Sequence, residues 1–505
     1  MIKFLDTQLN KITMYRLVLY VLIASLLVAF IYSVTGVLNT DPYALVFSTA
    51  FILAACAAAN WAFGKAFGIP TNVESVYISA LILALIISPI KSLNDLWFLL
   101  WASVLAMASK FIVAYKGKHL FNPIALAVAL TYFTVNQSAS WWVGNGPMLP
   151  FVLVGGLLIV RKIRRFGMLL SFVGATVLSL LLTSLFTHAN FFVDFQKLLL
   201  YSPFVFFATI ILTEPLSTPP TRRLQMIYAA IVGVLSNPQI HFGGFYITPE
   251  LAILAGNLYS YLVSPRDTLM LKLRDKTRLS PDTYEFTFTP ERRLAFVPGQ
   301  YMEWTLGLHN PDSRGNRRYF TLANSPTESV LKLGIKFPAN ASAYKKALLT
   351  LKRDEPVLAA QLSGDFVLPR DPRQKIVLIA GGIGITPFRS MLKYLLDKKQ
   401  RRPVTVFYSV KTADEIVYRD VLDQAARELG IRVIYNITDT QNVPATWKGN
   451  VGRITLEQIK AELPDLAHSY FYISGPDAMV DGFKASLSQL GVHSSQIKLD
   501  YFAGF

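Results

Sequence analysis

The sequence predicts an α-helical domain that crosses a membrane about ten times, followed by a soluble part of short strands and then a parallel α/β sheet. The composition is the first reason: 52% of the 505 residues are hydrophobic and 16% are charged, whereas soluble chains have about 25% charged residues. The second reason is the placement of the charges. Residues 1–265 hold 15 of the 49 Lys and Arg residues and 7 of the 32 Asp and Glu residues. The first half is therefore typical of a membrane domain, and the second half is typical of soluble domains.

The composition also limits the chemistry. The single cysteine, Cys56, cannot form an internal disulfide, a Cys-ligated iron–sulfur cluster or a Cys-rich zinc site. Six histidines restrict haem and His-metal sites, and we expect no bound metal. The net charge of +17 comes without a nucleic-acid motif, and basic cytoplasmic loops of a membrane domain explain it. We therefore expect no nucleic-acid partner.

Ten apolar segments of the first half are candidate spans, each of which needs about 20 apolar residues. The first segment follows Lys3, Lys11 and Arg16 and lacks a small-residue cleavage site, so it is interpreted as a span and not as a signal peptide. The predicted spans are residues 16–36, 44–63, 75–91, 95–114, 122–137, 147–161, 166–187, 198–213, 225–236 and 248–264.

The charges of the connecting loops predict the orientation. With the N-terminus inside, basic stretches at residues 116–118, 161–165 and 222–223 face the cytoplasm, which fits the positive-inside rule. The outside loops 138–146 and 237–247 contain no Lys or Arg. Two exceptions lie in other outside loops: Lys91 and Lys197. An even number of spans places both termini on the cytoplasmic side of the cell membrane, and five plus five spans would permit an inverted repeat.

The soluble half begins with short alternating strands at residues 269–274 and 283–289. They are followed by a segment, residues 317–326, in which an arginine stands beside aromatic side chains and a hydroxyl group. This combination suits a flavin, because Arg318 can pair with a pyrophosphate, an aromatic ring can cover the isoalloxazine, and Thr321 can bond its N5 edge. Alone, the segment could also be an ordinary edge strand.

A glycine-rich turn then follows an apolar strand at residues 375–380 and precedes a helical segment at 388–398. Glycines in this position let backbone amides approach phosphates at a helix N-terminus. Further strands at 404–409, 432–438 and 470–474 alternate with helices, which predicts a parallel, doubly wound sheet with its ligand at the carboxyl ends of the strands. The turn consists of Gly381, Gly382, Ile383, Gly384, Ile385, Thr386 and Pro387.

Together these motifs make residues 267–505 resemble the ferredoxin–NADP reductase family. The resemblance implies an antiparallel β-barrel that binds FAD, residues 266–370, and an α/β domain that binds NAD(P)H, residues 371–505. It also implies a flavin motif at Arg318, Tyr319, Phe320 and Thr321, a second flavin-phosphate contact at Ser342, and a nicotinamide-nucleotide loop at Gly381, Gly382, Gly384, Thr386 and Pro387.

The end of the chain carries the last part of this resemblance. Gly475 and Pro476 match the family's Cys-Gly-Pro motif, although Ser474 replaces the cysteine. The tail, residues 500–505, resembles an acidic-x-Phe-x-Gly-aromatic ending, in which Phe502 or Phe505 could shield the flavin. A plain hydrophobic strand is the alternative interpretation. The resemblance assigns the catalytic roles to these three residues: Thr321, Ser474 and Phe505. Ser409 and Lys411 could read a 2′-phosphate, but the choice between NADH and NADPH stays open.

Residues 115–265 resemble the RnfD/NqrB family, whose members are membrane components of the Rnf electron-transport complex and of the sodium-pumping NADH:quinone reductase. The resemblance rests on residues 121–125, Gly155-Gly156 and residues 213–233, where Glu214 replaces the usual Asp. Proteins of this family bind flavins in the membrane, which implies a second, noncovalent flavin (FMN or riboflavin) or a quinone here.

Covalent attachment of a flavin at Thr176 is not expected. The segment Gly174-Ala175-Thr176 resembles part of the family's acceptor motif, but Leu170 and Val173 stand where Asp and Ser or Thr belong. It also lies in the middle of a predicted span, where small residues usually allow helices to pack closely.

The sequence thus predicts a membrane-bound NAD(P)H dehydrogenase that passes electrons through FAD to the membrane domain and a quinone or an extracytoplasmic acceptor. Membrane lipid and other electron-transport subunits are the further partners considered. One alternative is a transporter or channel with an appended flavin reductase that acts as a redox sensor. Another is a ferric-reductase-like transmembrane reductase. Its haem-relaying form is disfavoured, since the membrane half has only His119, His188 and His241, all near loops.

Overall fold

The computed structural model describes residues 5–6, 8–9, 12–67, 73–115, 118–264, 269–308, 316–463 and 466–501. The chain divides into two compact units, Met1–Arg266 and Asp267–Phe505. Each unit has its own hydrophobic core and is described separately below.

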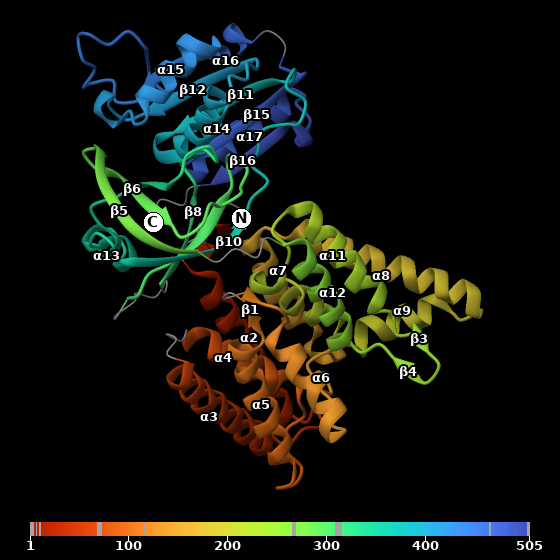
Figure 1. The fold of residues 1–505 in the computed structure, drawn as a ribbon. Helices are drawn as coiled ribbons and strands as arrows, with labels where there is room; N and C mark the ends of the chain where they lie inside the picture. Colours follow the sequence, from red (N-terminus) through yellow and green to blue (C-terminus); the bar gives the residue numbers. More distant parts are fainter. Residues whose placement is uncertain are drawn as a thin grey trace. The chain divides into compact units, whose positions relative to one another are not determined.

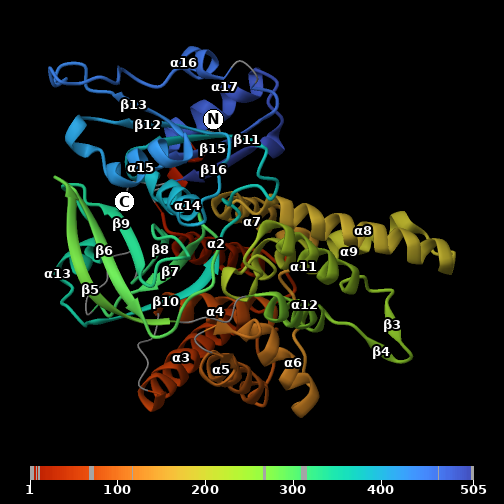
Figure 2. The same cartoon turned by 45° about the horizontal axis from the view of Figure 1, so that its top comes forward.

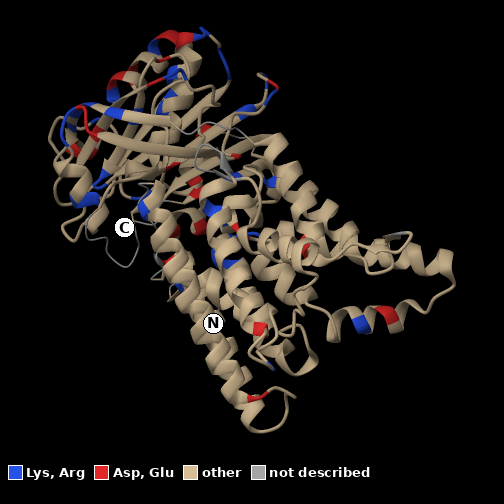
Figure 3. Ribbon diagram, turned by 60° about the horizontal axis from the view of Figure 1, so that its bottom comes forward, with Lys and Arg blue, Asp and Glu red and all other residues tan. Residues whose placement is uncertain are grey.

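The N-terminal unit is a bundle of helices (Figure 1), and its long helices carry few charged residues (Figure 3). Two short hairpins, β1–β2 (Ala114–Tyr115, Lys118–His119) and β3–β4 (His241–Phe242, Phe245–Tyr246), connect helices. The helices are α2 (Met14–Val34), α3 (Pro42–Phe67), α4 (Val73–Ile86), α5 (Asp95–Ile112), α6 (Pro123–Val135), α7 (Leu149–Ile163), α8 (Phe166–Thr187), α9 (Phe191–Leu200), α10 (Phe204–Phe206) with the π-helix Phe207–Ile211, α11 (Arg222–Leu235) and α12 (Pro249–Val263).

The predicted count of about ten spans is not supported. Every predicted segment overlaps a helix, but in the described residues four helices are long and apolar enough to cross a membrane: α2, α3, α5 and α8. A fifth span is possible if α9 and α10 with its π-helix, which meet at a 67° bend, count as one. Helix α4 shows why apolarity alone overcounts. Its 14 residues reach about 21 Å, and residues 80–87, which include most of its second half, are all buried in protein.

Helices α8 and α11 pack closely against each other through small residues. A Cβ on Gly233 would lie 2.6 Å from the Phe172 carbonyl oxygen. The Thr176 hydroxyl is fully buried and lies 2.9 Å from the Phe172 oxygen and 3.0 Å from the Gly233 oxygen, so it can donate to either carbonyl. Thr176 therefore serves helix packing, as the sequence interpretation of its small neighbours predicts.

Replacing Gly233 with Ala should destabilise the helical unit. The new methyl group meets backbone that cannot move away alone, and overpacking of this kind costs about 1–3 kcal/mol. The matched control is Gly174→Ala on α8, where no atom lies within 4 Å of the new Cβ. We expect a lower thermal midpoint for Gly233→Ala in detergent and an unchanged or higher one for Gly174→Ala. Equal midpoints for the two variants would contradict the packing described.

The C-terminal unit begins with a curved, six-stranded antiparallel sheet of strand order β8-β7-β10-β5-β6-β9. Helix α13 (Ala343–Thr350) packs Tyr344 and Leu348 into its core. The strands are β5 (Leu269–Ser280), β6 (Thr283–Pro290), β7 (Tyr301–Thr305), β8 (Arg317–Thr321), β9 (Leu331–Lys336) and β10 (Pro356–Ser363). The antiparallel sheet predicted for this region is therefore confirmed.

A parallel sheet of order β14-β13-β12-β11-β15-β16 completes the unit, as predicted. Helices α14 and α15 cover one face and α16 and α17 the other (Figure 2). The strands are β11 (Lys375–Gly381), β12 (Val404–Val410), β13 (Arg432–Ile437), β14 (Asn450–Val451), β15 (Ser469–Gly475) and β16 (Ile497–Tyr501), and the helices are α14 (Thr386–Asp397), α15 (Arg419–Leu429), α16 (Leu456–Glu462) and α17 (Asp477–Gln489).

Candidate functional site

Strand β8 brings two of the predicted flavin residues against the buried ring of Tyr344, and a third lies at the start of the helix that carries this ring. The Arg318 guanidinium lies 5.0 Å from the Tyr344 ring centroid, and the Phe320 ring lies 6.0 Å from it. Ser342 caps the N-terminus of α13, where its hydroxyl accepts a hydrogen bond from the Lys345 amide at 3.3 Å. A guanidinium and a helix N-terminus thus both lie close to one aromatic ring.

The alternation of β8 places the other two predicted residues on the opposite face. Thr321 pairs with Tyr301 of β7 and is buried. Tyr319 is half exposed, packs edge-on against Tyr301 at 5.7 Å, and donates to Gln361 at 3.4 Å. Arg318 and Phe320 therefore lie on one face of β8, and the hydroxyl groups of Tyr319 and Thr321 lie on the other.

The predicted nucleotide loop lies where the order of the parallel strands reverses. Strand β11 has β12 on one side and β15 on the other, so their carboxyl ends form the crevice in which doubly wound sheets bind ligands. Ala380 pairs with Ser474, and Gly381 pairs with Ser409. The loops that begin at Gly381 and at Ser474 therefore start side by side.

Two glycines, Gly381 and Gly384, let these loops meet. A Cβ on Gly384 would lie 2.3 Å from the Ser474 carbonyl oxygen, and a Cβ on Gly381 would lie 2.7 Å from the Met479 sulfur and 3.0 Å from Pro476. Gly382 has a φ of +54° and open space around it. The backbone at Gly382 is thus accessible, while its neighbours are packed.

The loop ends at the N-terminus of α14, the position at which helices bind phosphate. Thr386 is its first residue and donates from its hydroxyl to the Ile383 carbonyl at 3.1 Å, and Pro387 follows. Gly475 and Pro476 continue from β15 into α17. Lys411, just after β12, is exposed at the same edge of the sheet.

Ser474 is fully buried and faces Asp500 of the neighbouring strand β16. Its hydroxyl donates to the Asp500 carboxyl over a long 3.5 Å. Burial raises the pKa of Asp500 to about 6, against the opposing effect of the Ser474 hydroxyl. The other two predicted residues of the tail, Phe502 and Phe505, lie outside the described residues.

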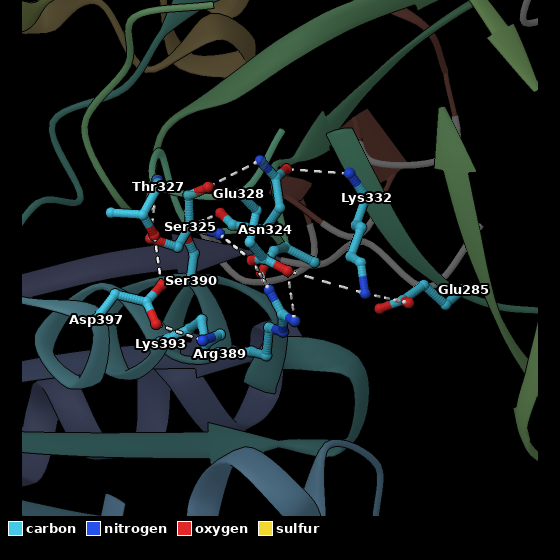
Figure 4. A network of polar contacts seen from close by, with 11 residues as sticks. Glu285, Asn324, Ser325, Thr327, Glu328, Lys332, Arg389, Ser390, Lys393 and Asp397 are labelled. Atoms are coloured by element: carbon cyan, nitrogen blue, oxygen red, sulfur yellow. Dashed lines mark hydrogen bonds and ion pairs between the residues drawn. The ribbon is translucent and has the colours of Figure 1, made fainter. Parts of the chain in front are cut away.

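A buried ion pair ties the two sheets together (Figure 4). Arg389 of α14 contacts both carboxylate oxygens of Glu328, one of them at 3.1 Å, and donates to the Ala323 carbonyl at 3.1 Å. Burial alone would raise the pKa of Glu328, but the hydrogen bond and charge of Arg389 hold it below its usual range. The carboxylate is therefore ionised, and it anchors the segment that follows the flavin strand.

Neighbouring polar groups extend this pair, which we call the Arg389 clamp. Ser390 donates to the Asn324 carbonyl at 2.6 Å, and the Asn324 side chain accepts from the Lys332 amide at 3.0 Å. The Lys332 ammonium pairs with Glu285 at 2.9 Å. The sequence analysis missed the clamp. Its only local signal is an arginine between Phe388 and Met391 on the buried side of a helix.

Comparisons with known proteins match this unit. Residues 378–485 match the family model described as Oxidoreductase NAD-binding domain. NADH-cytochrome b5 reductase 1 of Ajellomyces capsulatus is 27% identical over 262 residues, 49% of this chain and 83% of the relative. Flavohemoprotein A of Dictyostelium discoideum is 25% identical over 256 residues, 47% of this chain, but this match spans only 61% of the relative. A crystal structure of an Amycolatopsis cytochrome P450 reductase has a TM-score of 0.42 at 23% identity and covers 47% of this chain and 70% of that one.

Residues 378–485 of the C-terminal half thus form an oxidoreductase NAD-binding domain, as the sequence predicts. The enzyme is an FAD-dependent NAD(P)H oxidoreductase. None of these matches shows the resemblance of the N-terminal half to the membrane components of the Rnf complex and the sodium-pumping reductase, which stays a prediction.

Replacing Arg389 with Ala should destabilise the C-terminal unit strongly, because it removes the main partner of the largely buried Glu328 carboxylate. Breaking a buried pair costs about 3–5 kcal/mol. The control is Arg432→Ala, which removes an exposed arginine from an ion pair with Glu462 and should cost less than about 1 kcal/mol. Chemical unfolding of the purified chain, followed in the C-terminal unit, measures both. Equal stability of the two variants would show that the clamp is dispensable.

Asp500 should make stability depend on pH. The pKa of Asp500 in the folded chain lies above its usual value, so the neutral carboxyl stabilises the fold, and this contribution is complete at about pH 4. It is lost as the pH rises through 6 and the carboxyl ionises. When the pH is raised from 4 to 8, the free energy of unfolding of Asp500→Asn should therefore increase by about 2 kcal/mol relative to that of the wild type. Ser474→Ala removes a donor that lowers the pKa, so the transition should move above pH 6. Thermal midpoints across this pH range measure both effects, and parallel curves for the wild type and Asp500→Asn would contradict the prediction.

Proposed function

We propose that the chain is a membrane-bound NAD(P)H dehydrogenase that passes electrons from NAD(P)H through FAD to its membrane domain and on to a quinone or another acceptor. The proposed domains are residues 1–265 in the membrane, 266–370 for FAD and 371–505 for NAD(P)H. The observation that carries the proposal is one chain that joins an oxidoreductase unit to a helical unit with at least four helices apolar and long enough to span a membrane. Both termini are proposed to face the cytoplasm.

The residues present fit the phosphates of FAD. Arg318 supplies a planar set of donors, and the N-terminus of α13 beside Ser342 supplies backbone amides, so both suit a pyrophosphate. Thr321 is the last residue of the strand that carries Arg318. Bound FAD would accept a hydride and release electrons one at a time.

The residues of the second loop fit a nicotinamide nucleotide. The accessible backbone at Gly382 and the N-terminus of α14 would hold its phosphates. Ser474 and Asp500 would lie at the crevice where the ring enters, with Ser474 in place of a cysteine. Phe502 and Phe505 are proposed to cover the flavin until the nicotinamide displaces them.

A second candidate function, ion transport coupled to the reductase, is favoured by one observation. In the helical unit, Glu214 and Lys110 are half-buried. Glu214 accepts hydrogen bonds from Asn122 at 2.8 Å and from Ser217 at 3.0 Å, and Lys110 donates to Ser75. Ionisable groups inside a membrane domain mark ion or proton pathways. The transporter alternative predicts ion flux that depends on the flavin state, whereas the dehydrogenase predicts steady turnover with quinone.

Arg318→Ala should lose the proposed FAD. The purified wild-type chain should release about one FAD per polypeptide after acid precipitation, and the variant should release at least tenfold less because the pyrophosphate loses its charged donors. The matched control is Arg278→Ala, which removes an arginine from β5 that donates to the Pro281 carbonyl. Wild-type chain in liposomes should oxidise NAD(P)H with added quinone. A chain that contains FAD but transfers no electrons to quinone would contradict the proposed acceptor.

A further inference from the structure

Helices α8 and α11 of the N-terminal unit run parallel to each other. Near the start of both helices, a Cβ on Gly167 would lie 3.3 Å from the Arg222 Nε atom. One turn further along each helix, the Ser171 hydroxyl donates to the Met226 carbonyl at 2.7 Å. The contact of Gly233 with α8 follows about two turns later on α11. The contacts thus advance in the same direction on both helices, so their two N-termini lie side by side.

Basic residues gather at these two N-termini. Arg222 and Arg223 are the first two residues of α11, and both are exposed. Lys162 and the exposed Arg164 lie where α7 ends, within four residues of the start of α8. We call these four residues the basic rim. The first turns of α8 and α11, which the structure describes in full, contain no Asp or Glu.

The charges of the basic rim have the wrong sign for helix N-termini. The dipole of a helix places partial positive charge at its N-terminus, which favours acidic side chains or bound anions there and disfavours Lys and Arg. Two parallel helices add their positive ends at one place. The positive-inside rule explains why basic residues lie on this side of the unit, but loop positions would satisfy that rule equally well. The arrangement therefore indicates a bound anion.

Exposed apolar side chains begin within about a turn of the basic rim. Leu170 on α8 and Met226 and Ile227 on α11 are all exposed, and each lies four or five residues after the start of its helix. Helix α8 is one of the helices apolar and long enough to cross a membrane. An anion at the rim is thus followed along both helices by apolar surface of the kind that faces acyl chains. Basic sites between membrane helices on the cytoplasmic side bind the headgroups of anionic lipids in this way.

We propose that the basic rim binds the headgroup of an anionic phospholipid, whose acyl chains lie along the exposed apolar side chains of α8 and α11. The guanidinium groups of Arg164, Arg222 and Arg223 suit the phosphate, because each offers donors in a planar fork. The proposal goes beyond electron transfer, and it rests on the proposed function in one respect. That respect is the placement of this end of the helices at the cytoplasmic surface of the membrane.

Lipid binding to the full chain in detergent tests the proposal. The probes are phosphatidylglycerol, which is anionic, and phosphatidylcholine, which is zwitterionic. Phosphatidylglycerol should bind at least tenfold more tightly in native mass spectrometry and should raise the thermal midpoint of the chain. Inorganic phosphate at the same concentration should leave the midpoint unchanged, because it lacks acyl chains. Equal effects of the two lipids, or a stabilisation by phosphate that equals that by phosphatidylglycerol, would overturn the proposal.

Two variants locate the lipid. Arg222→Gln should weaken the binding of phosphatidylglycerol about fivefold. Without lipid, its thermal midpoint should equal or exceed that of the wild type, because a cation has been removed from a helix N-terminus. The control is Lys65→Gln, which removes an exposed lysine from the last turn of α3, where a cation suits the helix dipole, and it should change the affinity less than twofold.

Two outcomes of these variants would overturn the site. Equal losses of affinity in Arg222→Gln and Lys65→Gln would show attraction of the lipid to basic residues in general. A lipid-free midpoint of Arg222→Gln below that of the wild type would show that the arginine stabilises the helices without a ligand. Because these measurements involve neither FAD nor quinone, both outcomes leave the proposed dehydrogenase standing. Failure of the dehydrogenase in the quinone assay likewise leaves the lipid site standing.

Discussion

The Arg389 clamp is the constraint on which the geometry of the oxidoreductase unit depends. It joins the segment after β8, which carries the predicted flavin residues, to the helix that follows the predicted nucleotide loop. Taking two charges out of water costs several kcal/mol per ion, and their attraction offsets this only when the geometry is good. The pair is therefore a poor source of net stability but a strong positional constraint. Hydride transfer needs such a constraint, because the reacting atoms must come within about 3–3.5 Å of each other.

The glycines of the switch point also fix the geometry of the unit, but only within the parallel sheet. Side chains at Gly381 or Gly384 would push the ends of β11 and β15 apart, since their Cβ atoms would meet Met479 and the Ser474 carbonyl. The clamp holds one sheet against the other, and the glycines hold the two loops of the parallel sheet together. At the same edge of the sheet, Asp500 pairs with Ser474, and desolvation raises the pKa of its carboxyl to about 6.

The sequence predicts those parts of the site that are formed by neighbours in the chain. Residues 317–321 and 381–387 can be recognised in the sequence because strand, turn and helix N-terminus follow one another within a few positions. The partners Arg389 and Glu328 are 61 residues apart, and Ser171 and Met226 are 55 apart, so only the fold brings each pair together. The predicted number of spans is not supported, for a related reason. An apolar run does not reveal whether lipid or protein surrounds it, and residues 80–87 are buried in protein.

Helix α8 shows how one segment of the helical unit serves two roles. The Phe172 ring packs against the rings of Phe204 and Phe207, while its carbonyl oxygen and the Thr176 hydroxyl, one turn later, belong to the contact with α11. The hydroxyl is fully buried against two carbonyl oxygens, so it is not available as an attachment point for a ligand.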